Sequence, residues 1–394
     1  MRVAILQPRL FHYRLRMFAL LREELGRHGV ETELVHGQAS AAEALRHDEG
    51  SLPWATKVHN RFFRLFGRDV LWLPLPHSVH SADLVVMVQE NRILSNYLLL
   101  LKRRLGGPRI AYWGHGRNFQ SLAPSGLREK WKAFLLSRVD WWFAYTDLTV
   151  ELLTQRGYPP QRITNLQNAI DVSYFQRELS AVSDADIEAA RCLLGIDVRA
   201  RVGIFCGSLY AEKRIGLMLA AADLIRQAVP DFHLIVIGDG PSAAEVRTAA
   251  VSRPWIHVLG VRTGQDKAVM FRLAQVQLNP GLVGLHVLDA FSAGLPMIAT
   301  ATALHSPEIA YLLDGQNGVI TARDDAAGYA ESVIGLLADE SARLRLSQRC
   351  LADAQRYTVE NMVHNFCGGI LECLHTCCGK TVDAASARPV ERRA

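Results

Sequence analysis

The sequence predicts an α/β protein of two domains, each built on a parallel sheet covered by helices. Its 394 residues exceed the size at which a single hydrophobic core keeps growing, so we expect two domains. Short expected strands such as Val3–Leu6 and Glu31–Val35 alternate with helical patterns, as in βαβ units. The composition, 49% hydrophobic and 21% charged, is that of a globular protein with an ample core.

The loops after the strands of the first half carry the first candidate site residue. We expect strands at 83–88, 110–113, 141–145 and 163–166. The second of these ends at Gly114-His115-Gly116, and open parallel sheets bind ligands at the carboxyl ends of their strands. We therefore expect the His115 imidazole to be exposed there, available for a proton or a phosphate, the alternative being a histidine that only caps a turn. The loop Gln7–Arg14 lacks Gly-x-Gly-x-x-Gly, which argues against a dinucleotide dehydrogenase.

Leu278–Thr300 is the most informative stretch of the chain. It contains the end of a strand, a glycine-rich turn, a helix expected over about Leu285–Ala293, and another short strand. Gly281 and Gly284 are expected to permit positive φ and the close approach of a ligand to the backbone.

The start of that helix predicts an anion site. The backbone N–H groups of Gly284, Leu285 and His286 would be unpaired there, and the helix dipole favours negative charge. Asp289 follows on the same face, one turn after Leu285. The arrangement suits a nucleoside diphosphate, with the phosphates at the helix start and the carboxylate on the ribose hydroxyls. A turn that only reverses the chain is the alternative.

The second domain is expected to open with the strand Arg201–Cys206, followed by a loop that holds two cations. Lys213 would lie between a strand and a helix, where a flexible ammonium can neutralise phosphate charge. Arg214 is a second cation beside it, and a solvated surface lysine is the alternative for Lys213. Further strands are expected at 232–237 and 255–259, a helix at 326–337, and helical patterns to about 374.

A basic, aromatic segment at 55–68 predicts an amphipathic helix. Its basic residues recur at helical spacing beside three phenylalanines. These are Lys57, Arg61, Arg64, Arg68, Phe62, Phe63 and Phe66. Such a helix can lie on an anionic membrane surface, and packing on its own domain is the alternative. The run Lys102–Arg104 adds to this basic character.

The charge distribution supports an anionic partner. Residues 1–175 hold 23 Lys and Arg against 15 Asp and Glu, a balance of +8 within a net charge of +5. No nucleic-acid motif accompanies this charge, so we expect no nucleic acid as a partner. No apolar run approaches the about 20 residues of a membrane helix, and the first run is too short for a signal peptide. A cytoplasmic protein is expected, with a peripheral position on the inner face of the membrane left open.

Metal sites are not expected. Asp184 and Asp186 have the spacing of a metal-binding pair, but they follow Ser183 at a helix start, so we interpret them as capping residues. The seven cysteines are interpreted as reduced packing residues. The alternative is a zinc site drawn from the group Cys367, Cys373, Cys377, Cys378, His364 and His375.

Several motifs resemble those of the family-4 retaining glycosyltransferases of GT-B fold. Asp289-Ala290 and Gly294-Leu295-Pro296 match the second half of the family's nucleotide-sugar signature, and Glu212-Lys213 matches its Glu-Lys pair. Further matches are Asn168–Asp171, Gly238–Pro241, Ser306–Glu308 and Gly315–Gly318. The resemblance covers residues 1–376 and is most specific from 201 to 320.

The resemblance implies two Rossmann-like domains that face a central cleft. Residues 1–175 would bind the acceptor, 176–357 would bind the nucleotide-sugar, and a helix at 358–376 would pack back on the first domain. The tail at 380–394 is polar and charged, so we expect it to be disordered. The implied reaction is the retaining transfer of a hexosyl group to an acceptor hydroxyl, without a cofactor or metal. The basic segments of the first domain suggest a lipid-linked saccharide of surface or exopolysaccharide synthesis as the acceptor.

The resemblance also implies roles for the site residues. His115, Lys213 and Asp289 would be catalytic. The donor would be held by the residues of two loops and two helix starts: Gly207, Ser208, Lys213, Arg214, Arg262, Gly281, Gly284, Leu285, His286 and Asp289. Gly281 replaces the family's first Glu and Ser208 replaces an Arg. These departures leave open a non-catalytic degenerate subunit, and a nucleotide-sugar epimerase is the other alternative.

Overall fold

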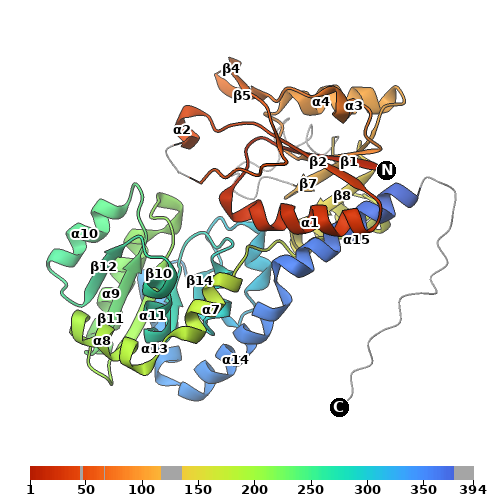
Figure 1. Cartoon of the computed structure of the whole chain (residues 1–394). Helices are drawn as coiled ribbons and strands as arrows, with labels where there is room; N and C mark the ends of the chain where they lie inside the picture. The colour runs from red at the N-terminus through yellow and green to blue at the C-terminus, as the bar shows by residue number, and fades with distance from the viewer. Residues whose placement is uncertain (45–47, 66, 117–134, 377–394) are drawn as a thin grey trace, which may run out of the picture.

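The computed structural model describes residues 1–44, 48–65, 67–116 and 135–376. It shows two parallel sheets that follow one another along the chain, which confirms the predicted α/β class (Figure 1). The tail expected at 380–394, and Cys377 and Cys378, lie outside the described residues.

The first sheet has the strand order β3-β2-β1-β6-β7-β8-β9. β1 (Arg2–Gln7) pairs in parallel with a strand on either side. Alternate side chains of β1 enter two different hydrophobic cores. Val3 and Ile5 lie in the core on one face of the sheet, and Ala4 and Leu6 lie in the core on the other face. A strand buried on both faces needs a continuous apolar run, which β1 has. The other strands are β2 (Glu31–His36), β3 (Thr56–Lys57), β6 (Leu84–Val88), β7 (Arg109–Gly114), β8 (Trp141–Ala144) and β9 (Ile163–Asn165).

Helices pack on this sheet and supply the rest of the two cores. Met17 and Phe18 of α1 join Val3 and Ile5 on one face, and Leu99 of α4 joins Ala4 and Leu6 on the other. The helices of this part are η1 (His12–Arg14), α1 (Leu15–Arg27), α2 (Ala41–Ala44), α3 (His77–His80), α4 (Leu94–Arg104), α6 (Asp147–Gln155) and η2 (Pro160–Arg162).

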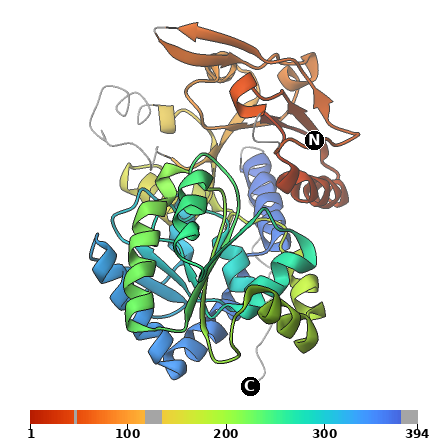
Figure 2. The same ribbon diagram turned by 90° about the vertical axis from the view of Figure 1, so that its left-hand side faces the viewer.

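The second sheet has the order β12-β11-β10-β13-β14-β15 and is parallel throughout. Figure 2 views this sheet with helices on both sides. Its strands are β10 (Arg201–Cys206), β11 (Phe232–Ile237), β12 (Ile256–Gly260), β13 (Val276–Leu278), β14 (Met297–Thr300) and β15 (Gly318–Thr321). The helices are α7 (Ser173–Ala181), α8 (Asp184–Leu194), η3 (Ala211–Lys213), α9 (Ile215–Ala228), α10 (Ala243–Val251), α11 (Gly264–Leu273), α12 (Val287–Ser292), η4 (Pro307–Tyr311), α13 (Ala326–Ala338) and α14 (Glu340–Arg356).

The last helix, α15 (Val359–His375), leaves the second sheet and lies along α1 (Figure 1). Arg16 of α1 donates to Glu360 at 2.5 Å, and Arg109 of β7 donates to the carbonyl oxygens of Cys373 and Leu374. Phe366 stacks edge-on against Trp113 within the core of the first sheet. The end of the chain is therefore part of the packing around the first sheet.

The helix predicted over 55–68 is wrong. The segment forms β3 and then an antiparallel ribbon of β4 (Arg61–Leu65) and β5 (Arg68–Trp72). Aromatic and β-branched residues such as Phe62, Phe63 and Val70 favour extended backbone, and Gly67 supplies the positive φ of the turn. Phe66 lies outside the described residues. In the described part of the chain, no helix is long and apolar enough to cross a membrane.

Candidate donor site at the ends of the second sheet

The turn between β13 and α12 presents backbone donors to its surroundings. Among the described residues, the N–H groups of Gly284, Leu285 and His286 have no hydrogen-bond acceptor. The helix is shorter than predicted, because α12 begins only at Val287. Three neighbouring unpaired amides remain, and they can bind an oxygen-rich anion.

The expected positive φ at Gly281 and Gly284 is wrong, since neither glycine has it. Gly281 is required for a different reason. A Cβ atom built there would lie 2.3 Å from the carbonyl oxygen of Glu212, and the N–H of Leu282 donates to that oxygen at 2.8 Å. The close neighbour of Gly281 is therefore the backbone of the loop after β10.

Lys213 lies beneath this turn and is 3% exposed. Its Nζ donates to the carbonyl oxygen of Leu282 at 2.6 Å and lies 3.4 Å from Nδ1 of His286. Burial lowers the pKa of Lys213 to about 7, because the charged ammonium is poorly solvated there. An anion bound at the turn would supply the missing counter-charge.

His286 adds a further donor. An ammonium can only donate a hydrogen bond. When Lys213 is charged, Nδ1 of His286 must therefore be the acceptor in their contact, and the proton of the neutral ring lies on Nε2. That Nε2 is buried and has no partner among the described residues. Burial and the charges of Lys213 and Lys267 hold the pKa of His286 well below its usual value. A neutral N–H is thus left unpaired beside the turn.

His305 fixes the turn from the other side. Its Nδ1 accepts from the N–H of Val283 at 3.0 Å, so its Nε2 carries the proton and donates to the carbonyl oxygen of Thr300 at 2.7 Å. Both ring nitrogens are therefore paired with backbone, and burial lowers the pKa of His305. The imidazole holds the 282–283 peptide in place as a neutral group.

Asp289 does not stand free on α12. Its carboxylate forms an ion pair of 2.9 Å with Lys267 of α11, and both side chains are largely buried. The Lys267 ammonium also lies 4.2 Å from the centre of the Phe175 ring, and Asp289 contributes to raising its pKa. Sequence reasoning missed Lys267, since no motif marks it.

The remaining predicted donor residues lie at the same end of the second sheet. Arg214 adopts positive φ, donates to Thr300 and Thr302, and pairs with Asp324. Gly207 directly follows β10. Its carbonyl oxygen lies so close to Gly238 that a Cβ atom on Gly238 would clash with it.

The other two are exposed. Ser208 follows Gly207 in the loop after β10, and Arg262 follows β12. Arg262 forms no ion pair with a described residue.

His115 follows β7 in the first domain and is exposed, as predicted. Its ring packs edge-on against Tyr145 at 4.4 Å between ring centres. The protein around it and the charge of Arg14 nevertheless lower its pKa to about 4, so the imidazole is neutral at pH 7. Residues 117–134, which follow this loop, lie outside the described part.

A buried polar chain connects the two domains near His115. Arg14 donates to Asn168 at 2.5 Å, and Asn168 donates to Glu308 of η4 at 2.6 Å. The hydroxyl of Tyr311 donates to the carbonyl oxygen of Asn168 at 3.0 Å. Burial raises the pKa of Glu308. Asn168 and Glu308 lie in motifs of the sequence, but no pattern indicated that they meet.

The candidate metal ligands have other roles in the described residues. The hydroxyl of Ser183 accepts from the N–H of Asp186, whose carboxylate accepts from the N–H of Ser183, so the interpretation as a helix cap is confirmed. Cys367 and Cys373 are buried on α15. No group of three or more potential ligands gathers in the part of the chain that the structure describes.

Comparison with known proteins agrees with this geometry. Residues 200–339 match the family model described as glycosyl transferases group 1. The chain is 26% identical over 187 residues to the D-inositol 3-phosphate glycosyltransferase of Corynebacterium urealyticum, an alignment covering 44% of this chain and 43% of that protein. It is 28% identical over 184 residues to the phosphatidyl-myo-inositol mannosyltransferase of Mycolicibacterium smegmatis, covering 45% and 47%. The chain thus spans less than half the length of these curated relatives.

The whole chain is similar in structure to a solved protein. Anabaena HepE, crystallised in complex with UDP, superposes with a TM-score of 0.67 at 15% identity, covering 94% of this chain and all of that one. Such a likeness establishes the arrangement of the two sheets. The protein therefore has the GT-B fold, and its residues 200–339 match the model of the group 1 glycosyltransferases.

Proposed function

We propose that the protein is a glycosyltransferase that moves a hexosyl group from a nucleotide-sugar to an acceptor hydroxyl. The observation that carries the proposal is the group of donors around one turn: buried Lys213, the unpaired amides of 284–286 and the Nε2 of His286. A leaving diphosphate gains negative charge as the glycosidic bond breaks. Donors already in position stabilise that charge without reorganisation, which is often the largest electrostatic contribution to catalysis.

We propose that this charge is balanced without a metal ion. Lys213 and His286 supply a cation and a neutral donor on the same side of the turn, and the amides supply three further N–H groups. Asp289, held by Lys267, is proposed to accept a hydrogen bond from a ribose hydroxyl. Transfer is expected to continue in excess chelator, and loss of transfer that Mg²⁺ restores would contradict this part of the proposal.

The acceptor is proposed to be a lipid-linked saccharide at the inner leaflet, in surface or exopolysaccharide synthesis, with the anomeric configuration retained. One relative's name specifies a phosphatidyl-inositol acceptor, and the first 175 residues carry a charge of +8, from 23 basic and 15 acidic residues. His115, at the carboxyl end of β7, is proposed to face the reacting centre from the acceptor side.

Calorimetry with nucleoside diphosphates, followed by an acceptor assay, tests the proposal. The protein should bind one nucleoside diphosphate, and release of that diphosphate from the matching sugar donor should require added acceptor. NMR of the product then reports whether configuration is retained. Binding without transfer to any acceptor would favour the non-catalytic subunit, and free epimer without acceptor would favour the epimerase.

A further inference from the structure

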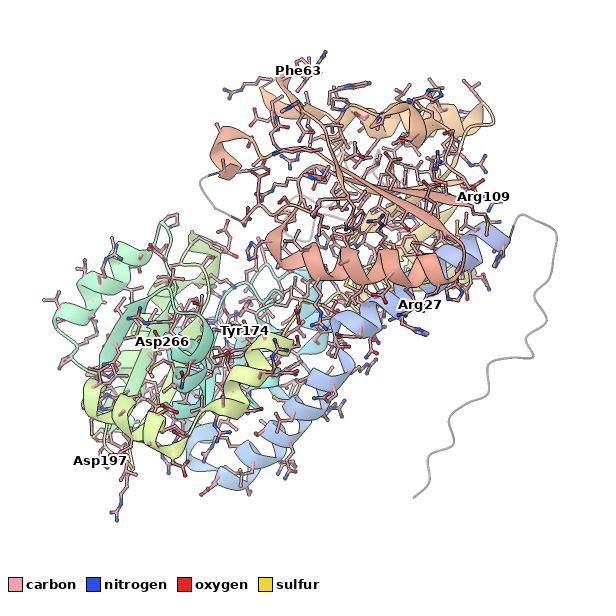
Figure 3. The ribbon with its side chains drawn as sticks, viewed as in Figure 1. Arg27, Phe63, Arg109, Tyr174, Asp197 and Asp266 are labelled. Carbon is pink, nitrogen blue, oxygen red and sulfur yellow. The ribbon has the colours of Figure 1, made fainter. Side chains whose placement is uncertain are left out.

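The β4–β5 ribbon presents an unpartnered apolar face. All five residues of β4 are exposed, including Phe62 at 38%, Phe63 at 50% and Leu65 at 50%. The ribbon lies at the end of the first domain farthest from the second sheet, with Phe63 at the edge of the molecule (Figures 1, 2 and 3). Large exposed apolar side chains that cluster in this way commonly mark an interaction surface.

The register of the ribbon sorts its side chains by face. Phe63 lies opposite Val70, and Arg61 lies opposite Trp72, so these four residues share one face with Leu65. The other face carries Leu71, which is 2% exposed and packs into the core of the first domain. The face that bears Phe63 and Leu65 is therefore directed away from the core.

Two arginines accompany the apolar residues. Arg61 lies on the face with Phe63, whereas Arg64, opposite Asp69, lies on the other face of the same strand. Both are exposed, and neither forms an ion pair within the described residues. Long arginine side chains can keep their charge at a lipid headgroup while neighbouring apolar side chains enter the acyl boundary.

The end of α4, a helix whose start contacts the ribbon through Ser95 and Leu73, carries a similar combination of residues. Leu101 and Leu105 are 56% and 78% exposed, and Arg104 next to them is exposed as well. α4 contacts β5, and both lie at the same end of the molecule (Figure 1).

We propose that the face of the ribbon with Arg61, Phe63 and Leu65, together with Arg64 on the same exposed strand and the end of α4, docks the protein on an anionic lipid bilayer. The +8 charge of residues 1–175, from 23 basic against 15 acidic residues, complements such a surface. A second copy of the chain fits less well, because arginines on an open strand oppose edge-to-edge pairing of like-charged copies. A projecting ribbon can also insert into a deformable bilayer without a preformed pocket on the partner.

The inference goes beyond the proposed transfer reaction. Docking depends on Arg61, Phe63 and Leu65 of one face and on Arg64 of the same strand, and the ribbon lies at the far end of the first domain from the donor turn (Figure 1). Donor binding and membrane binding can therefore fail separately, and one set of variants distinguishes them.

Co-sedimentation with vesicles tests the proposal on the full chain. The protein should bind vesicles that contain roughly 30% anionic phosphatidylglycerol in phosphatidylcholine, because anionic headgroups attract the arginines. It should bind vesicles of pure phosphatidylcholine at least about tenfold more weakly. Binding should fall as salt is raised. The double variant Arg61→Glu/Arg64→Glu should lower affinity by at least about 30-fold, and Phe63→Ser/Leu65→Ser by at least about tenfold.

A matched control lies on the second domain. Leu193 is 83% exposed and Arg272 is also exposed. The variant Leu193→Ser/Arg272→Glu therefore removes an exposed apolar side chain and an exposed arginine from the second domain instead of the ribbon. This control should bind vesicles like the parent, and all variants should keep the parent's thermal unfolding and nucleoside diphosphate affinity.

Any of four results would overturn the proposal. The ribbon variants could bind vesicles as tightly as the parent, the control could lose as much binding as they do, or the parent could bind neutral and anionic vesicles equally. The parent protein could also fail to bind vesicles and instead form a dimer that Phe63→Ser/Leu65→Ser abolishes. That result would assign the face to a second copy of the chain and would overturn the proposal as well.

Discussion

Lys267 and Asp289 form an ion pair of 2.9 Å that joins α11 to α12 beside the donor turn. The two residues are separated in sequence by β13 and the glycine-containing turn, so the pair fixes the angle at which α12 leaves that turn. Since both side chains are largely buried, loss of either partner would leave an uncompensated charge. The pair therefore positions a carboxylate that is one methylene shorter than the glutamate expected there.

Asp289→Ala should weaken the binding of nucleoside diphosphates by about 10- to 150-fold, the value of one or two hydrogen bonds to a charged group. The loss should be confined to ligands that carry a ribose, because the phosphates meet the turn and Lys213 instead. Calorimetry with a nucleoside diphosphate and with inorganic pyrophosphate measures the difference. If pyrophosphate loses as much affinity as the nucleotide, Asp289 acts on the fold of the site and not on the ribose.

Diphosphate binding should take up a proton at Lys213. Burial lowers the pKa of Lys213 to about 7, and a bound diphosphate favours the charged ammonium and raises that pKa. Below pH 7 the group is already charged, so affinity should be constant there. Above pH 7 a proton must be bound together with the ligand, so affinity should fall by up to about tenfold per pH unit.

Calorimetry at pH 8 in two buffers of different ionisation enthalpy measures this uptake directly. Lys213→Met should bind diphosphate about 10- to 150-fold more weakly and take up no proton. Lys213→Arg, which stays charged at this pH, should also take up none. Equal proton uptake by the parent and by Lys213→Met would assign the titration to another group.

His115→Ala should lower the turnover number by about 10²- to 10⁴-fold if the imidazole handles charge or a proton at the reacting centre. The pKa of His115 is about 4, so the ring is neutral at pH 7 and can act as a base or as a neutral donor. Steady-state rates with a matched donor and acceptor test this. Exposed His77 on α3 is the control, and His77→Ala should keep the parent's rate. Unchanged turnover in His115→Ala would remove this residue from the reacting centre.

The sequence predicts the strands well because each is a short apolar run that is buried on both sides of a parallel sheet. β1, β10 and β11 lie within one residue of their expected bounds. The ribbon at 61–72 was mistaken for a helix because Arg61, Arg64 and Arg68 happen to recur at helical spacing. Phe62-Phe63 and the turn at Gly67 favour the extended form, and a spacing rule does not weigh those local preferences.

The site was predictable only where a motif marks it. Lys213 and the amides of 284–286 follow from local patterns, whereas Lys267 and Glu308 are brought in by tertiary packing. Nothing in the spacing of Lys267 relative to Asp289 indicates that α11 and α12 meet at these two residues. The role of Gly281 was also hidden, because its close neighbour is 69 residues earlier in the chain, at Glu212.

That close contact leads to a prediction about Gly281 itself. Gly281→Ala should destabilise the protein by about 1–3 kcal/mol, because the added Cβ would lie 2.3 Å from backbone atoms that cannot rotate away. The displaced backbone belongs to the loop that carries Lys213, so affinity for nucleoside diphosphates should fall as well. Gly284→Ala is the matched control, since its Cβ would meet nothing nearer than 3.7 Å.

Gly281→Glu, which restores the residue of the related family, should therefore impair the protein instead of improving it. A larger side chain begins with the same Cβ and meets the same carbonyl oxygen of Glu212. Thermal unfolding and calorimetry of both Gly281 variants decide the matter. A Gly281→Glu protein that unfolds at the parent's temperature and binds donor more tightly would mean that the loop after β10 can move aside. The position would then be an open part of the donor site, and the buried contact with Glu212 would not be what requires glycine there.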